Sequence, residues 1–126
     1  MIVGIGVDIV QIGRMERWLE NPKLLERFFH SQEIDFAFSR NKNAAKTLAA
    51  RFAAKEAFGK ALGTGFEEIS LKDIMVTNNE KGKPDLKLRE TAQRALERSG
   101  ADKVHISLSH EMENAIAMII LERLEK

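Results

Sequence analysis

A proline-free run rich in alanine, Lys42 to Leu62, constrains the fold more than any other part of this chain. Such a run predicts one long α-helix. The sequence Gly63-Thr64-Gly65, which follows directly, is a typical helix stop. At about 100° per residue, the charges of this helix form two narrow groups instead of one broad polar face: Arg51 with Lys55, and Lys46 with Glu56 and Lys60. We therefore predict a central helix that is packed on several sides.

Glu56 is the least expected residue of this helix. It lies among Leu48, Phe52 and Gly59 on a stripe that should be packed. A carboxylate in such a place is costly unless a cation or hydrogen bonds satisfy it. A simple ion pair with Lys60, four residues later, would explain it equally well, so the helix by itself leaves two interpretations open.

Composition narrows the class of protein. The chain has 126 residues, enough for one domain with a core, and it has no cysteine, which excludes disulfides and thiolate metal sites. We find no apolar run of membrane-spanning length and no secretion signal, so the expected location is the cytoplasm, without a membrane partner. A net charge of +1 argues against a general nucleic-acid binder.

Charge is nevertheless unevenly distributed. The segment from Arg40 to Lys60 contains six basic residues and one acidic residue, Glu56. A local excess of this size attracts anions such as phosphates, although a solvated basic face would have the same composition.

The N-terminal segment, Met1 to Val10, is predicted to be a buried strand. Its odd positions are all apolar and share one face, while Gly4, Gly6 and Asp8 share the other. Because the glycines have no side chains, this arrangement predicts a hollow beside the Asp8 carboxylate. The alternatives are that the glycines serve backbone packing and that Asp8 caps the next helix.

The remaining pattern predicts one domain, residues 1–126, of the α+β class. In it an antiparallel sheet packs around and against the long central helix. Apolar periodicity and turn residues predict helices at 11–20, 23–29, 31–38 and 89–99, and strands at 71–77, 85–88, 103–109 and 115–121.

Two carboxylates, Asp8 and Glu56, thus occur in elements that otherwise look buried, and together they would suit a hard cation. Magnesium favours one or two carboxylates, several waters and the phosphate oxygens of a substrate. Arg51, Lys55 and Lys60 on the same helix suit a phosphate-rich ligand. This combination favours displacement at phosphorus, which depends on charge stabilisation and positioning.

A third segment with possible ligand contacts is Ser107-Leu108-Ser109-His110. It is either a strand end whose hydroxyls bind a phosphate or a polar sheet face.

Over nearly its whole length the chain resembles the holo-acyl-carrier-protein synthase type of 4'-phosphopantetheinyl transferase, a short trimeric type. The resemblance is carried by four motifs: Gly4-Ile5-Gly6-Val7-Asp8 followed by Arg14; Arg51-Phe52-Ala53-Ala54-Lys55-Glu56-Ala57 with Lys60 and Gly63-Thr64-Gly65; Gly82-Lys83-Pro84; and Ser107-Leu108-Ser109-His110. The segment from Gln11 to Asn43 matches only loosely.

The resemblance implies transfer of 4'-phosphopantetheine from coenzyme A to a serine of apo-acyl carrier protein, with release of adenosine 3',5'-bisphosphate, in support of fatty acid biosynthesis. It implies Mg²⁺ on Asp8 and Glu56, with Lys60 near the phosphates, and a homotrimer with active sites at the subunit interfaces. The implied coenzyme A contacts are Arg51, Lys55, Lys60, Gly63, Gly65, Lys83, Pro84, Ser107, Ser109 and His110.

An acidic carrier protein would be received by Arg14, Arg17, Trp18 and Lys23, unless these residues only form a solvated amphipathic helix. Two other functions remain as alternatives. A phosphodiesterase or nuclease would use the same carboxylates with a positioned water, and a non-catalytic module would bind coenzyme A or an acidic partner without them.

Overall fold

The computed structural model describes residues 1–125 of the chain. Its helices and strands in chain order are β1 (Ile2–Gln11), α1 (Ile12–Trp18), α2 (Pro22–Phe28), α3 (Ser31–Ser39), α4 (Ala44–Leu62), β2 (Ile74–Asn78), β3 (Pro84–Leu88), α5 (Glu90–Ser99), β4 (Lys103–His110) and β5 (Asn114–Glu122). Short 3-10 turns at Asn41–Asn43 and Leu71–Asp73 precede α4 and β2.

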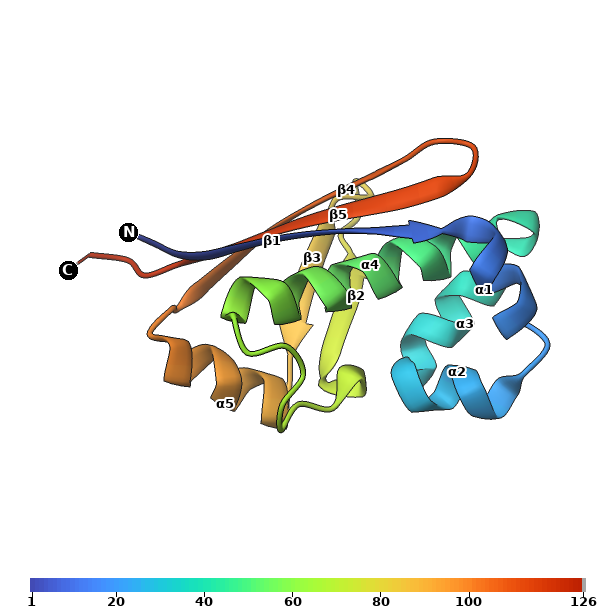
Figure 1. The fold of residues 1–126 in the computed structure, drawn as a ribbon. Coiled ribbons are helices and arrows are strands. Elements are labelled where there is room, and N and C mark those ends of the chain that lie inside the picture. Colours follow the sequence, from blue (N-terminus) through green and yellow to red (C-terminus); the bar gives the residue numbers. More distant parts are fainter. Residues whose placement is uncertain (126) are drawn as a thin grey trace.

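The strands form two antiparallel groups. A three-stranded sheet has the order β1-β5-β4, and β2 pairs with β3 in a separate hairpin. Figure 1 shows the long helix α4 running beneath the three-stranded sheet, with α1, α2 and α3 gathered at one of its ends and α5 near the other. The predicted α+β class, with antiparallel strands packed on one long helix, is confirmed.

Helix α4 is buried on several sides, as predicted from its lack of a broad polar face. Alanines 49, 53, 54 and 57 and Phe58 have no exposed surface. The helix ends at Gly63, which adopts a left-handed conformation with φ of 81° and donates its N–H to the Lys60 carbonyl at 3.1 Å. A glycine is favoured at this point because it has no Cβ to oppose that conformation.

Strand β1 is covered on the face opposite to the one predicted. Of the apolar odd positions, Ile5, Val7 and Ile9 are 61%, 52% and 59% exposed, and the glycine face lies against α4. A Cβ atom at Gly4 would stand 2.0 Å from the Ala61 carbonyl oxygen. Only a strand face without side chains allows this approach, so the helix covers that face.

The same contact corrects the predicted hollow. A Cβ atom at Gly6 would stand 2.0 Å from the carbonyl oxygen of Ala57, so the backbone of α4 fills the space beside the glycines. Backbone packing, the alternative interpretation, is therefore the role of Gly4 and Gly6.

The exposed side of the sheet has a mainly apolar region that we call the outer face. It consists of Ile5, Val7 and Ile9 on β1 and, in register with them, Ile120, Met118 and Ile116 on β5. The inner side of β5 carries Ala115, Ala117, Ile119 and Leu121, all fully buried against the core. Among the helices of residues 1–125, none combines the length and apolar character that crossing a bilayer requires.

Candidate active site

The close contact between β1 and α4 brings Asp8 and Lys60 together. Asp8 follows Gly6 on the same strand face, and Lys60 lies one turn of helix beyond Glu56. The Lys60 ammonium donates to Asp8 Oδ1 at 2.9 Å and to the Val7 carbonyl at 3.1 Å. The Asp8 side chain is 17% exposed and that of Lys60 is 57% exposed, so this ion pair lies at the edge of the sheet and is open to a ligand.

Glu56 lies close enough to Asp8 for the two charges to interact. Burial raises the pKa of Glu56 above its ordinary value, the charge of Asp8 raises it further, and Arg14 and Lys60 act in the opposite direction. Two neighbouring carboxylates that are partly removed from water are stabilised by a cation between them.

The chemistry of this pair fits magnesium. Among residues 1–125, no group of three or more His, Cys, Asp or Glu side chains could form a metal site made of protein ligands alone. Magnesium does not require such a cage, because it keeps several waters and takes phosphate oxygens from the substrate. Asp8 and Glu56 could therefore hold Mg²⁺ together with a diphosphate ligand.

Arg14 packs its guanidinium over two aromatic rings and lies close enough to Glu56 for its charge to lower the pKa of that carboxyl. Its guanidinium carbon is 5.3 Å from the centre of the Trp18 ring and 5.2 Å from that of Phe52. Trp18 is half-buried and stacks on Phe28 at 5.3 Å, so it belongs to an aromatic cluster between α1, α2 and α4. Of the other predicted carrier contacts, Arg17 and Lys23 are exposed.

Apart from the group around Asp8, a pocket lies between the first half of α4, the β2–β3 loop and the end of β4. We call it the hairpin pocket, and its volume is about 570 Å³. It is lined by Phe36, Arg40, Asn43, Lys46, Thr47, Ala50, Arg51, Asn78, Asn79, Glu80, Gly82, Pro84, Leu108 and His110. Three cations and a histidine against one carboxylate make this pocket suitable for an anionic ligand.

Arg51 is the buried cation of the hairpin pocket. Arg51 is 4% exposed, and its guanidinium carbon is 4.6 Å from the centre of the Phe36 ring. Its Nη2 donates to Asn78 Oδ1 at 2.8 Å. Its Nε is buried without a hydrogen-bond partner among residues 1–125. A buried donor left unpaired is unfavourable, so this N–H is available to donate to an acceptor atom of a ligand.

Lys55 does not fit the phosphate-binding role suggested by the sequence. Its ammonium is completely buried and donates to Glu33 Oε1 at 2.7 Å, to the Leu71 carbonyl at 2.9 Å and to the Ile74 carbonyl. Because an ammonium has three donors, all of them are used. Lys55 therefore ties α3 and the start of β2 to α4.

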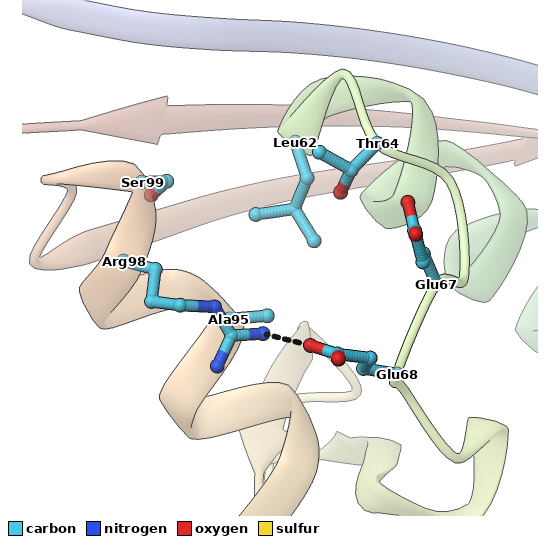
Figure 2. Close-up of a pocket in the computed structure, with 7 residues that line it drawn as sticks. All are labelled: Leu62, Thr64, Glu67, Glu68, Ala95, Arg98 and Ser99. Carbon is cyan, nitrogen blue, oxygen red and sulfur yellow. Dashed lines mark ion pairs between the residues drawn. The ribbon is translucent and has the colours of Figure 1, made fainter.

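The other predicted contacts lie at the surface. Lys83 is exposed in the β2–β3 loop, and Ser107 and Ser109 are exposed on β4 beside the outer face. Gly63 and Gly65 flank Thr64, which lines a cavity of about 300 Å³ between the end of α4 and α5. Figure 2 shows Glu67, Glu68 and Arg98 at this cavity, with Arg98 and Glu68 paired at 4.0 Å. Its two carboxylates against one cation make it a poor phosphate site.

The sequence interpretation did not identify Glu33, Asn78, Arg40 or Lys46 as members of these networks. For Glu33 a signal was present, because it stands three residues after His30 and forms a capping box with it. Arg40 and Lys46 belong to the basic segment that was recognised only as a whole. Asn78 carried no local signal.

The predicted site residues thus form two separate groups. Asp8, Glu56 and Lys60 lie at the edge of β1, while Arg51, Pro84 and His110 line the hairpin pocket. Within residues 1–125, none of the first group lines that pocket.

Comparison with known proteins places the chain in a family. The profile of the 4'-phosphopantetheinyl transferase superfamily matches residues 4–117. A holo-[acyl-carrier-protein] synthase of Treponema denticola is 52% identical over 122 residues, which cover 97% of this chain and 99% of the relative.

Solved structures agree with this relationship. A holo-(acyl-carrier-protein) synthase of Bacillus anthracis in complex with CoA (3',5'-ADP) is 39% identical, with a TM-score of 0.82 over 98% of this chain and 99% of that one. The synthase of Neisseria meningitidis is 33% identical, with a TM-score of 0.86 over 98% and 100%. This chain therefore belongs to the 4'-phosphopantetheinyl transferase superfamily, among its holo-[acyl-carrier-protein] synthases.

Proposed function

We propose that residues 1–126, acting as one domain, transfer 4'-phosphopantetheine from coenzyme A to a serine of an apo-acyl carrier protein. The reaction depends on Mg²⁺, releases adenosine 3',5'-bisphosphate and supports fatty acid biosynthesis in the cytoplasm. The observation that carries this proposal is the meeting of Asp8, Glu56 and Lys60 where β1 lies against α4. The coenzyme A ligand of the B. anthracis relative supports the choice of substrate.

The residues of this chain would act as follows. Asp8 and Glu56 would hold Mg²⁺, which when bound would supply Lewis-acid polarisation of the coenzyme A diphosphate. The carrier serine oxygen forms a bond to the β-phosphorus, and the bond from that phosphorus to the bridging oxygen breaks. Lys60 offsets the charge that builds on the departing bisphosphate. The serine proton would pass to the Glu56 carboxylate, the proposed general base.

Mass spectrometry tests the reaction directly. Apo-carrier incubated with coenzyme A, Mg²⁺ and this protein should gain one phosphopantetheine on one serine. The Glu56→Gln variant should lose transfer by at least about a hundredfold, because it removes a metal ligand and the proton acceptor. Glu97→Gln on the exposed side of α5 is the matched control and should retain wild-type activity. Hydrolysis of coenzyme A without any carrier would instead favour a hydrolase.

The outer face supports a proposal about assembly. Ile5, Val7, Ile9 and Met118 expose 41–61% of their surface on one continuous side of the sheet. Exposed apolar patches of this kind mark interaction surfaces. We assign this face to contact between copies of the chain in a homotrimer. Val7→Lys should convert the trimer to monomers in light scattering coupled to size exclusion, whereas a wild-type protein that is already monomeric would contradict the assignment.

Each active site in this trimer would combine Asp8 and Glu56 of one copy with the hairpin pocket of its neighbour. A complementation experiment tests this arrangement. Asp8→Asn and His110→Ala chains are purified separately, each with little activity, then unfolded together and reassembled. If two copies build one site, random assembly restores about a quarter of the wild-type sites. If one copy builds its own site, no mixed assembly contains an intact site and mixing restores nothing.

The carrier would dock on α1 and the start of α2. Arg14, Arg17 and Lys23 offer exposed cations there, and acidic carriers are attracted by such a surface. Arg17→Glu should raise the KM for the carrier by roughly tenfold while leaving the KM for coenzyme A unchanged. An equal effect on both substrates would place Arg17 elsewhere in the mechanism.

A further inference from the structure

The loop that joins β2 to β3 is held in one shape by its own hydrogen bonds. Asn79 Oδ1 accepts from the N–H groups of Lys81 and Lys83, each at 2.9 Å. The backbone of Asn79 also pairs with Lys83 and Gly82 at 2.9 Å, and Gly82 has φ of 83°. Because these backbone donors are used within the loop, a ligand would meet its side chains.

One side chain connects this loop to the central helix. Asn78, the last residue of β2, accepts a hydrogen bond from Arg51 Nη2 at 2.8 Å through Oδ1 and donates from Nδ2 to the Gly82 carbonyl at 3.0 Å. The orientation of the amide follows from chemistry: a guanidinium only donates and a carbonyl only accepts, so no other orientation satisfies both partners.

The anchor at the helix end of this connection is rigid. Arg51 is 4% exposed and packed against the ring of Phe36. Further along the same helix, Lys55 holds the start of β2 through the Ile74 carbonyl. Lys55 thus fixes one end of β2 on α4, and Arg51 fixes the other end through Asn78.

The connected residues share one cavity. Arg51, Asn78, Gly82 and Pro84 all line the hairpin pocket, and Lys83 lies between the last two in the chain. A change in the angle of the loop would therefore move the Lys83 ammonium relative to the Arg51 guanidinium. Two cations recognise a phosphorylated ligand well only when their spacing matches it.

We propose that Asn78 is a positioning residue for coenzyme A: by joining Arg51 to the Gly82 carbonyl, it sets the spacing between the cations of α4 and Lys83. This proposal deepens the proposed function and rests on it. Asn78 acts through the loop, and Lys83 makes the contact with the ligand.

Calorimetric titration of the magnesium-loaded protein with coenzyme A tests this role, alongside steady-state transfer to apo-carrier. Asn78→Ala should weaken coenzyme A binding by roughly five- to tenfold, the loss expected when one or two positioning hydrogen bonds are removed. The kcat should change less than about twofold, because Asp8 and Glu56 lie on other elements. A merely structural role would lower the melting temperature and leave the dissociation constant of the folded protein unchanged.

A double-variant cycle with Lys83→Ala separates positioning from direct contact. If Asn78 acts through Lys83, the Asn78→Ala/Lys83→Ala protein should bind coenzyme A about as weakly as Lys83→Ala alone. Effects that add in full, or no effect of Lys83→Ala, would overturn the proposal.

The control is Asp102→Ala, which also deletes a hydrogen bond between an exposed side chain and the backbone, here the one that Asp102 Oδ1 accepts from the Leu124 N–H at 3.0 Å. It should bind coenzyme A as the wild type does. If the wild type itself neither binds coenzyme A nor modifies the carrier, the proposed function fails. If the wild type does both and Asn78→Ala binds equally well, only the role of Asn78 fails.

Discussion

Replacing Lys55 by methionine removes one partner of a fully buried ion pair. The Glu33 carboxylate would keep its bonds from the N–H groups of His30 and Val76, at 3.0 and 3.1 Å, but would lose its only ammonium partner among residues 1–125. The carbonyls of Leu71 and Ile74 would lose a donor as well. Methionine has a similar length, so the change concerns charge and hydrogen bonding more than volume.

The expected destabilisation is large. Removing one partner of a buried pair costs about 3–5 kcal/mol, because a charge is left in the core without compensation. A domain of this size has a free energy of unfolding of roughly 5–15 kcal/mol, so Lys55→Met should remove about a fifth of it or more. Burial lowers the pKa of Lys55, while Glu33 acts against this shift and favours the charged ammonium.

Urea unfolding provides the assay. Trp18 is the single tryptophan and packs against Phe28 and Phe52, so its fluorescence reports on the packing of α1 against α4. With a slope of about 2 kcal/mol per molar urea, the midpoint should fall by roughly 1.5–2.5 M at a fixed protein concentration.

Two variants complete the test of Lys55. Glu33→Gln/Lys55→Met leaves no uncompensated charge and should recover at least about 1 kcal/mol of the loss. Lys87→Met changes an exposed lysine of β3 and should stay within about 0.5 kcal/mol of the wild type. If Lys55→Met lowers the free energy of unfolding by less than about 1 kcal/mol, the conclusion that the Lys55 ammonium is buried and fully hydrogen-bonded is wrong.

Three further predictions follow from the contact between β1 and α4. Gly6→Ala should destabilise the fold by about 3 kcal/mol or more and abolish transfer, because its Cβ would stand 2.0 Å from the Ala57 carbonyl oxygen. Thermal melts measure this loss. The control is Gly13→Ala, which has open space around the added Cβ and should be neutral. Without metal, Glu56 binds more protons in the folded protein than in the unfolded chain, because folding raises its pKa. The resulting contribution to the free energy of unfolding is complete below the ordinary pKa of 4.5 and is lost as the pH rises through the folded pKa. The urea midpoint of the wild type should therefore fall relative to that of Glu56→Gln as the pH rises above 4.5. A difference between the two midpoints that stays constant with pH would contradict a raised pKa of Glu56. Added Mg²⁺ should raise the melting temperature of the wild type but not of Asp8→Asn, and equal shifts would exclude Asp8 as a ligand.

Local features of the sequence were sufficient to predict most of the secondary structure and the position of the central helix. The strand predicted at 71–77 was wrong at its start, where Leu71–Asp73 form a 3-10 turn and β2 begins at Ile74. The alanine-rich run from Lys42 to Leu62 and the glycine after it depend on neighbours only a few residues away, as helix propensity and capping do. The motifs around Asp8 and Glu56 were visible for the same reason, and the structure brings these two residues together.

The roles of individual cations were decided only by tertiary structure. The sequence suggested the same phosphate-binding role for Lys55 and Lys60, although the two lysines belong to different charge groups of one helix. Folding places the first against Glu33, 22 residues away, and the second against Asp8, 52 residues away. Asn78 acquires its role from Arg51, 27 residues earlier, and no local pattern marks such a partner.

Strand β1 illustrates the same division. Its alternation of apolar residues and glycines predicted the strand and its two faces correctly, but not which face the helix would cover. Apolar character favoured burial of Ile5, Val7 and Ile9, whereas the close approach of α4 is possible only over Gly4 and Gly6. Periodicity assigns residues to a face through local backbone geometry, while the choice of the covered face depends on whether two backbones fit together, which is a property of the folded chain.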